Sequence, residues 1–151
     1  MHAIDLEKYL VEHIPISSAM GVKVDVISAE KIILRAPLLN NINHKKTAFG
    51  GSLHAVATLA CWSFLHVKLI ELFQDPAQIV IASSEINYLF PVTSDFKAEC
   101  NQPEFSDWER FLKMLRQKGK GRLQLKARIV EKEQVCVSYS GVFVTTNTLL
   151  H

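Results

Sequence analysis

The chain has 151 residues, enough for one domain with a substantial core, and nothing in its length requires a second domain. Its composition, 48% hydrophobic and 21% charged, is that of a globular protein and excludes a disordered or fibrous class. Seventeen basic and fifteen acidic residues leave a formal charge of +2, too small to indicate nucleic acid binding. We therefore expect a single domain over residues 1–151 that binds no nucleic acid.

The first part of the chain predicts a short helix and a hairpin. Apolar residues recur at helical spacing from residue 5 to about residue 14, and Pro15 marks a stop. Valines then alternate with polar residues over 22–26, and the alternation resumes over 32–36 after a short turn. Two alternating runs this close together predict an antiparallel hairpin, which Pro37 closes.

The most apolar segment runs from Gly50 to Phe73, after an asparagine-rich loop over 40–43. It contains no formally charged residue between Gly50 and Val67. About 20 apolar residues are also enough to cross a membrane. Strands are predicted on both sides, however, and open strands cannot satisfy their backbone groups in lipid. Because a helix that is apolar on every face is normally buried, we expect a core helix and no membrane span.

Four further strands are predicted in two pairs. A β-rich run covers 79–88, and apolar residues alternate with charged ones over 96–100. The clearest alternation covers 123–129, and a partner strand extends over 135–146 after a turn at 131–134. The last two runs therefore predict a long hairpin at the end of the chain.

An amphipathic helix is predicted between these two pairs. Ser106 and Glu109 have the spacing of a capping box, and the apolar residues that follow share one helical face until about Gly119. Hairpin-length connections within each of the three strand pairs predict antiparallel pairing. Since one sheet of six strands must cover a helix that is apolar all round, we expect strong curvature of the sheet or a second subunit.

The three cysteines at positions 61, 100 and 136 are too far apart for a zinc site or a disulfide scaffold. The residues after Met1 do not combine a basic region with an apolar one, so no secretory signal is evident. We expect a reducing, cytoplasmic location. We also expect the cysteines to act as small hydrophobic side chains and not as nucleophiles.

The run NHKKTAFGGSL, from Asn43 to Leu53, is followed by an alanine-rich apolar helix. It resembles the motif of the hotdog thioesterase superfamily, and in particular its YiiD C-terminal type. The run SEINYLFPV, over 84–92, resembles the strand that follows the central helix in that superfamily. The resemblance spans nearly the whole chain. It implies an α+β hotdog fold, in which a curved antiparallel sheet of six strands wraps around a long central helix, with additional short helices.

The resemblance also implies an activity. Hotdog thioesterases hydrolyse acyl groups carried on coenzyme A or on acyl carrier protein, usually as homodimers or homotetramers with the site between subunits. We therefore expect an acyl-thioester substrate and a homodimer or homotetramer. We expect no cofactor and no metal ion.

Four residues at the helix entry are predicted to be catalytic: Asn43, Gly50, Gly51 and Ser52. Glycine permits close approach of a ligand, and the N–H groups at a helix N-terminus carry partial positive charge. An N–H of Gly50 or Gly51 aimed at the thioester oxygen would act as an oxyanion hole. Asn43 resembles the Asn or Asp that precedes the glycine pair in many relatives, and would position water or the carbonyl or simply shape the loop. Ser52 stands where an N-cap residue would, and would cap the helix or orient the attacking water.

Four residues are candidates for substrate binding: His44, His54, Thr58 and Glu85. His54 and Thr58 are one helical turn apart and share a face that would line a substrate tunnel, although a buried histidine bonded to a neighbour fits the same spacing. His44, beside two lysines, would act as a base or remain solvated. Many relatives carry an acid on the central helix, but this helix has none before Glu71. Glu85 would substitute for that acid or would be an ordinary outward-facing strand residue.

The missing helix carboxylate leaves three mechanisms open. Asn43 and the backbone donors position water without a strong base, or a partner subunit supplies the base, or hydrolysis is not the activity. In the last case the chain is a non-catalytic acyl-thioester binding module or a hotdog hydratase or dehydratase. Segment 113–128, which is basic and lacks acidic residues, would contact the carrier's phosphates or form a solvated face.

Overall fold

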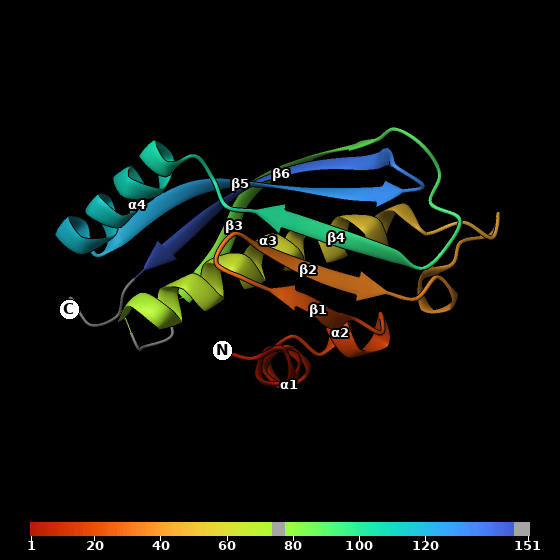
Figure 1. Cartoon of the computed structure of the whole chain (residues 1–151), viewed down its shortest axis with the longest axis horizontal. Coiled ribbons are helices and arrows are strands. Elements are labelled where there is room, and N and C mark those ends of the chain that lie inside the picture. Colours follow the sequence, from red (N-terminus) through yellow and green to blue (C-terminus); the bar gives the residue numbers. More distant parts are fainter. Residues whose placement is uncertain (74–77, 147–151) are drawn as a thin grey trace.

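The computed structural model of the chain describes residues 1–73 and 78–146. Figure 1 shows its helices and strands, which follow the predicted order with a short second helix and a 3-10 turn added. The elements are α1 (Ala3–His13), α2 (Ile16–Ala19), β1 (Lys23–Ile27), β2 (Lys31–Ala36), η1 (Leu39–Asn41), α3 (Gly50–Phe73), β3 (Gln78–Tyr88), β4 (Phe96–Asn101), α4 (Phe105–Lys118), β5 (Lys120–Glu131) and β6 (Gln134–Thr146).

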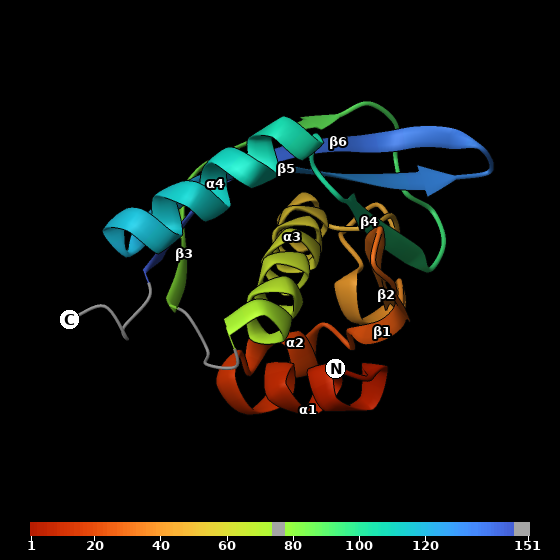
Figure 2. The same ribbon diagram turned by 60° about the vertical axis from the view of Figure 1, so that its left-hand side comes forward.

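The strands form one six-stranded sheet in the order β1-β2-β4-β5-β6-β3. Every neighbouring pair is antiparallel. In Figure 2 the sheet curves around α3, and α1 and α2 cover the side of α3 that the sheet leaves open. The expected hotdog fold, a curved antiparallel sheet around a long central helix, is therefore confirmed.

The predicted pairing of the third and fourth strands is wrong. Although β3 and β4 are consecutive, β4 pairs with β2 and β5, and β3 pairs with β6 at the far edge of the sheet. The connection over residues 89–95 runs around the end of the sheet and does not turn back on β3 (Figure 1). Because the sheet has to close around α3, β3 is placed on the other side of the helix from β4. A local sequence pattern contains no information on that placement.

Helix α3 is the centre of the core. Its length and composition would allow it to cross a membrane, but 61% of the residues in its most apolar stretch are buried inside the fold. Its neighbours are the strands β2, β3, β4, β5 and β6. Burial against five strands explains why the sequence of α3 is apolar on nearly every face, and the prediction of a core helix is confirmed.

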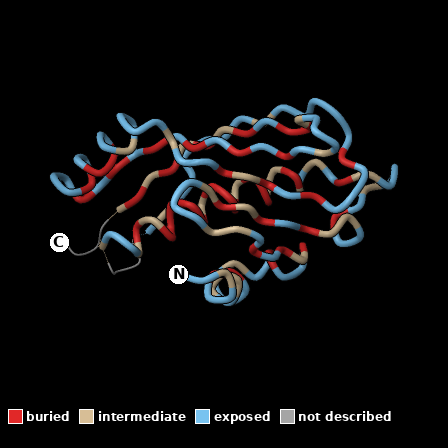
Figure 3. The backbone as a smooth tube through the Cα atoms, in the orientation of Figure 1, coloured by how far each residue is buried: buried red, intermediate tan, exposed pale blue. Residues whose placement is uncertain are grey.

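The hairpin of β5 and β6 lies between β4 and the edge strand β3. Buried and exposed residues alternate along β5, as the sequence predicts and as Figure 3 shows. The two turn residues, Lys132 and Glu133, have φ values of 52° and 65°, the left-handed conformation that a two-residue hairpin turn requires. Leu125 and Ala127 of β5 therefore face α3, while Lys126 and Arg128 face outward.

The ends of α4 differ in how well the sequence predicts them. The capping box at Ser106 is wrong, because α4 begins at Phe105 and Glu104 is its N-cap residue, with ψ of 140°. The carbonyl of Glu104 already accepts a hydrogen bond from the N–H of Trp108. The C-terminal end lies where predicted, since Gly119 adopts a φ of 70° and donates its N–H to the carbonyl of Leu115.

Candidate functional site

Helix α3 presents three free amides at its start. The carbonyl of Phe49 accepts the first helical hydrogen bond, from the N–H of Leu53 at 3.1 Å. The N–H groups of Gly50, Gly51 and Ser52 precede that bond, and none of them donates to another residue within 1–73 or 78–146. Gly51 is exposed and its two neighbours are not. Three donors with the partial positive charge of a helix N-terminus therefore lie together at an accessible helix entry.

Ser52 is not the N-cap residue, so the capping role considered for it is wrong. The helix begins two residues earlier, at Gly50. Backbone hydrogen bonds hold the chain up to that point, from the N–H of Ala48 to the carbonyl of Val92 and from the N–H of Phe49 to the carbonyl of Asn41. As the third residue of α3, Ser52 contributes one of the three free amides.

Asn43 organises the loop that leads to the helix. Its side-chain amide donates to Thr47 Oγ1 at 2.8 Å and to the carbonyl of Ala48 at 3.4 Å. Its Oδ1 accepts from the N–H groups of Lys45, at 2.8 Å, and Thr47, at 3.1 Å. These four bonds use both donors and both lone pairs of the amide within the loop. Its catalytic role stays a prediction, as does the role of His44, which is exposed in the same loop.

Polar side-chain contacts join α3 to the edge strand β3. Three of them follow one another along the helix: Tyr88 Oη donates to the carbonyl of Gly50 at 2.9 Å, His54 Nε2 lies 3.0 Å from Ser84 Oγ, and Trp62 Nε1 donates to the carbonyl of Ile79 at 3.4 Å. The helix entry, a histidine and a tryptophan are thus placed along one seam between α3 and β3.

Glu85 lies apart from this seam. Successive side chains of a strand point to opposite faces, and Ser84 and Tyr88 both contact α3. The side chain of Glu85, between them, faces the other surface of the sheet and is exposed. The structure does not bring Glu85 together with His54 within one chain, and its role in substrate binding stays a prediction.

His54 and Thr58 share a face of α3, as their spacing predicts, but they contact different strands. Thr58 Oγ1 donates to Tyr139 Oη of β6 at 2.9 Å. The ring of Tyr139 also lies beside His54, with centroids 5.6 Å apart. Burial raises the pKa of Tyr139 to about 12, so its hydroxyl stays protonated at neutral pH.

An apolar groove of about 470 Å³ continues from the seam along α3. Apolar side chains from α3, β3, β6 and the α1–α2 region line it, and Thr58 contributes the polar atom nearest the helix entry. On α3 the lining residues are Ala55, Thr58, Leu59 and Trp62, of which Trp62 is farthest from Gly50. A groove of this polarity fits an aliphatic chain better than a charged or polar ligand.

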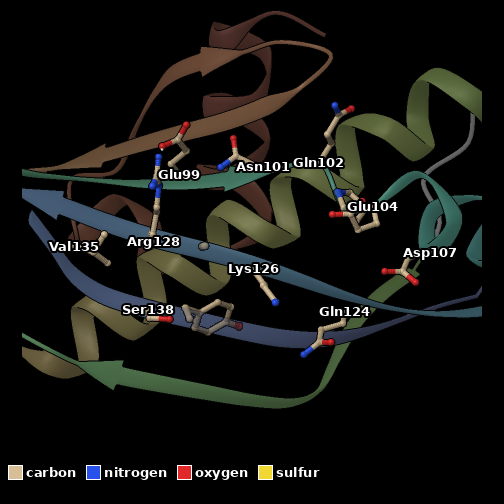
Figure 4. A pocket seen from close by; sticks show the side chains of 13 residues that line it. Glu99, Asn101, Gln102, Glu104, Asp107, Gln124, Lys126, Arg128, Val135 and Ser138 are labelled. Carbon is tan, nitrogen blue, oxygen red and sulfur yellow. Dashed lines mark ion pairs between the residues drawn. The ribbon is translucent and has the colours of Figure 1, made fainter. Parts of the chain in front are cut away.

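A second hollow, of about 450 Å³, lies on the outer face of the sheet (Figure 4). It is polar and contains both charges, with Glu99 paired to Arg128 at 3.5 Å and to Lys31 at 3.4 Å. Lys126 and Gln124 of β5 also line it, on the face opposite α3. This hollow is therefore separated by the sheet from the helix entry.

The basic segment 113–128 is divided between two elements: its first residues belong to α4, at the other end of the central helix, whereas Lys126 and Arg128 lie on the outer face of β5. Arg116 of α4 stacks over the ring of Phe73, the last residue of α3, at 5.8 Å. A helix of 24 residues is about 36 Å long, so α4 is far from Gly50 of the same chain. Contact of the segment with the carrier's phosphates stays a prediction, and for the residues of α4 it would require a site shared with another subunit.

Sequence reasoning did not identify Ser84, Tyr88, Tyr139 or Trp62 as parts of the site. The alternation of β3 indicates that Ser84 and Tyr88 share a face, but it does not say which face meets α3. Tyr139 is separated from its partner Thr58 by 81 positions in the sequence. Only the arrangement of the strands around α3 brings these side chains to the seam.

Comparisons with known proteins agree with this architecture. The family model described as "Putative thioesterase (yiiD_Cterm)" matches residues 3–147. The chain is similar to a protein of unknown function from Chlorobaculum tepidum, at 31% identity and a TM-score of 0.89, over 97% of this chain and 94% of that one. A "putative thioesterase" from Shewanella oneidensis is 26% identical with a TM-score of 0.81, over 95% and 96% of the two chains. A thioesterase from Haemophilus influenzae shares the fold at 14% identity and a TM-score of 0.72, over 100% and 94%.

Proposed function

The chain belongs to the YiiD C-terminal-type thioesterase family, and we propose that it hydrolyses an acyl thioester at the N-terminal end of α3. One observation carries this proposal: three unpartnered amides, those of Gly50, Gly51 and Ser52, lie at the entry of a helix that also lines an apolar groove. The amides suit a carbonyl oxygen that becomes negatively charged, and the groove suits an acyl chain.

In the proposed reaction, water attacks the carbonyl carbon of the thioester. The carbonyl oxygen becomes an oxyanion, and the N–H of Gly50 or Gly51 donates to it in a site that glycine leaves sterically open. The C–S bond then breaks, and a carboxylic acid and a thiol are released. Removing one donor from an oxyanion hole typically lowers turnover by about 100-fold or more, so the helix entry would make a large contribution to the rate.

The acyl carrier is coenzyme A or acyl carrier protein, both of which present the acyl group on the same flexible arm. Two aromatic side chains lie against the helix entry and remain largely exposed, Phe49 at 56% and Tyr88 at 52%. Exposed aromatic rings beside a site are suited to contact such an arm or a second subunit.

A second copy of the chain is the partner that the edge strand favours. Strand β3 is 11 residues long, and within residues 1–73 and 78–146 it pairs on one side only, with β6. It carries the exposed apolar residues Val80 and Ile81. A long edge strand with exposed apolar residues is prone to pair with another strand, which supports a homodimer with the helix entries near the interface.

A non-catalytic binding module is the second candidate. The observation that favours it is the absence of any carboxylate on α3 before Glu71, because hydrolysis needs a group that activates water. A module of this kind would use the same groove and the same amides, but would release no thiol.

Release of free thiol from acyl-coenzyme A substrates of increasing chain length tests these alternatives. The hydrolase proposal expects turnover on at least one chain length, whereas measurable binding without any thiol release would establish the binding module. A hydratase would convert an unsaturated substrate without freeing the thiol. Asn43→Ala belongs in the same series, since unchanged turnover would show that Asn43 only shapes its loop.

A further inference from the structure

We propose that His54 is the general base of this hydrolysis and that Ser84 is a positioning residue that orients its imidazole. The inference rests on the proposed function, and it identifies a water-activating group on a helix that has no carboxylate near its entry. Neither residue needs a partner subunit for the arrangement described below.

The first argument is the place of His54 on α3. It follows Gly50 by four residues, so the two positions lie on the same side of the helix, one turn apart. Helical side chains lean toward the N-terminus and cover the turn before their own Cα. The imidazole is therefore directed toward the turn that carries the free amides.

The second argument is the contact with Ser84. His54 Nε2 and Ser84 Oγ are 3.0 Å apart, within hydrogen-bonding distance. Ser84 is held in the middle of β3, opposite Gly141 of β6. When Nε2–H donates to Ser84 Oγ, the other ring nitrogen, Nδ1, keeps its lone pair and can accept a proton. No hydrogen bond occupies Nδ1 of His54 in the described part of the chain.

The third argument is the chemistry of the neighbours. From β6, Tyr139 faces the imidazole, but its hydroxyl stays protonated at neutral pH and already contacts Thr58. From β3 the contact is a serine, and α3 itself has no formally charged residue before Lys68. Imidazole is the side chain that most readily accepts a proton near neutral pH, which makes His54 the suitable base on this helix face.

The step balances without any further reactant. Nδ1 of His54 takes one proton from water as the water oxygen bonds to the carbonyl carbon, and the C=O electron pair moves to the oxygen beside the amides. When that pair returns, the C–S bond breaks and its electrons leave with sulfur. The imidazolium then returns the proton to the thiolate, so the products are a carboxylic acid and a thiol, and His54 is neutral again.

The test compares steady-state kinetics and pH profiles of the full chain and its variants on an acyl-coenzyme A that the wild type hydrolyses. His54→Ala and His54→Gln should both lower kcat by about 100-fold or more and remove the acidic limb of the pH profile. Ser84→Ala should lower kcat by about tenfold, and Ser84→Thr should restore it, because only the orienting hydrogen bond is lost. Ser83→Ala is the matched control, since Ser83 is exposed and points to the opposite face of β3.

Thermal unfolding of each variant shows whether it is folded. The two His54 substitutions differ in size and polarity, so one folded variant is enough to read the result. Wild-type kcat and an unchanged acidic limb in either folded His54 variant would overturn the proposal. The proposal would also be overturned if Ser84→Ala were as inactive as His54→Ala and the mass spectrum of the wild type showed an acyl adduct on Ser84, because the serine would then be a nucleophile. If the wild type releases no thiol, the proposed function itself is contradicted. If the wild type and His54→Ala are both active, only the role of His54 as general base is contradicted.

Discussion

Tyr88 donates a hydrogen bond of 2.9 Å from its hydroxyl to the carbonyl oxygen of Gly50, and so joins the last residue of β3 to the first residue of α3. A Cβ added to Gly50 would lie 3.4 Å from the Tyr88 ring, which places the ring directly against the helix entry. The edge strand and the free amides are therefore parts of one structure.

Replacing Tyr88 by Phe removes this hydrogen bond and keeps the ring. We expect a loss of about 1 kcal/mol in the free energy of unfolding, equivalent to a few degrees in Tm, because the bond is partly solvated and the ring still packs. Tyr88→Ala should cost more and should also raise KM, since it removes the ring from the helix entry. Thermal unfolding and thiol-release kinetics measure both effects. A Tyr88→Ala variant that matches Tyr88→Phe in stability and KM would contradict a role for the ring.

Gly51→Ala should impair activity without unfolding the protein. The added Cβ would come within 2.4 Å of the Phe49 ring, which is too close for the present conformation. Phe49 is largely exposed, so its ring can move into solvent at little cost in stability. The displaced ring and the new methyl group would both crowd the amides, and kcat/KM should fall by about tenfold or more while Tm changes by only a few degrees. If Gly51→Ala had the kcat/KM of the wild type, the thioester would not bind at these amides.

Trp62 should set the length of the acyl chain that the groove accepts. Its indole lies farthest along α3 from the entry and is held by its bond to Ile79 and by the ring of His66, with centroids 4.7 Å apart. Trp62→Ala opens the end of the groove, so the acyl-chain length with the highest kcat/KM should increase. Each additional buried CH₂ is worth about 0.8 kcal/mol, which is about fourfold in kcat/KM.

The measurement for Trp62 is kcat/KM across a series of saturated acyl-coenzyme A substrates. Trp62→Phe keeps an aromatic ring of smaller size and should give an intermediate optimum. The same chain-length optimum in wild type and Trp62→Ala would show that the groove does not hold the acyl chain.

Acid should destabilise the fold through His66. Its ring packs against the rings of Tyr9 of α1 and Trp62, is only 1% exposed, and its Nε2 has no hydrogen-bond partner among the described residues. Burial, with a smaller contribution from nearby His13, lowers the pKa of His66 from 6.5 to about 4. The unfolded chain therefore binds the proton first as pH falls. The contribution of neutral His66 to the free energy of unfolding is fully present above about pH 6.5. It is lost as pH falls from about 6.5 to about 4, by at most about 1.4 kcal/mol per pH unit.

His66→Phe keeps an aromatic ring in the stack and removes both the titration and the unpaired nitrogen. Urea unfolding of both proteins at pH 7, 6 and 5 measures the difference, and the variant should become progressively more stable relative to wild type as pH falls. Groups that titrate elsewhere affect the two proteins equally. Parallel pH dependences would show that His66 is protonated equally in the folded and unfolded states.

The part of the site that could be predicted is the part held within one element. His54 and Thr58 share a face because four residues make about one helical turn, and Gly50 and Gly51 lie at the entry because the apolar run begins there. An N-cap at Ser52 would start the helix after that residue, whereas α3 begins at Gly50, because backbone bonds from Ala48 and Phe49 to distant residues decide where the extended chain ends.

By itself, the sequence determined the number and type of the main elements, the burial of α3, the final hairpin and the membership of a thioesterase family, since periodicity and motif are properties of neighbouring residues. The tertiary structure alone decided that β3 pairs with β6 and not with β4, and so that Ser84 meets His54 and Tyr139 meets Thr58. These contacts join residues 30 and 81 positions apart. They follow from the closure of the whole sheet around one helix, which depends on the packing of all the strands at once.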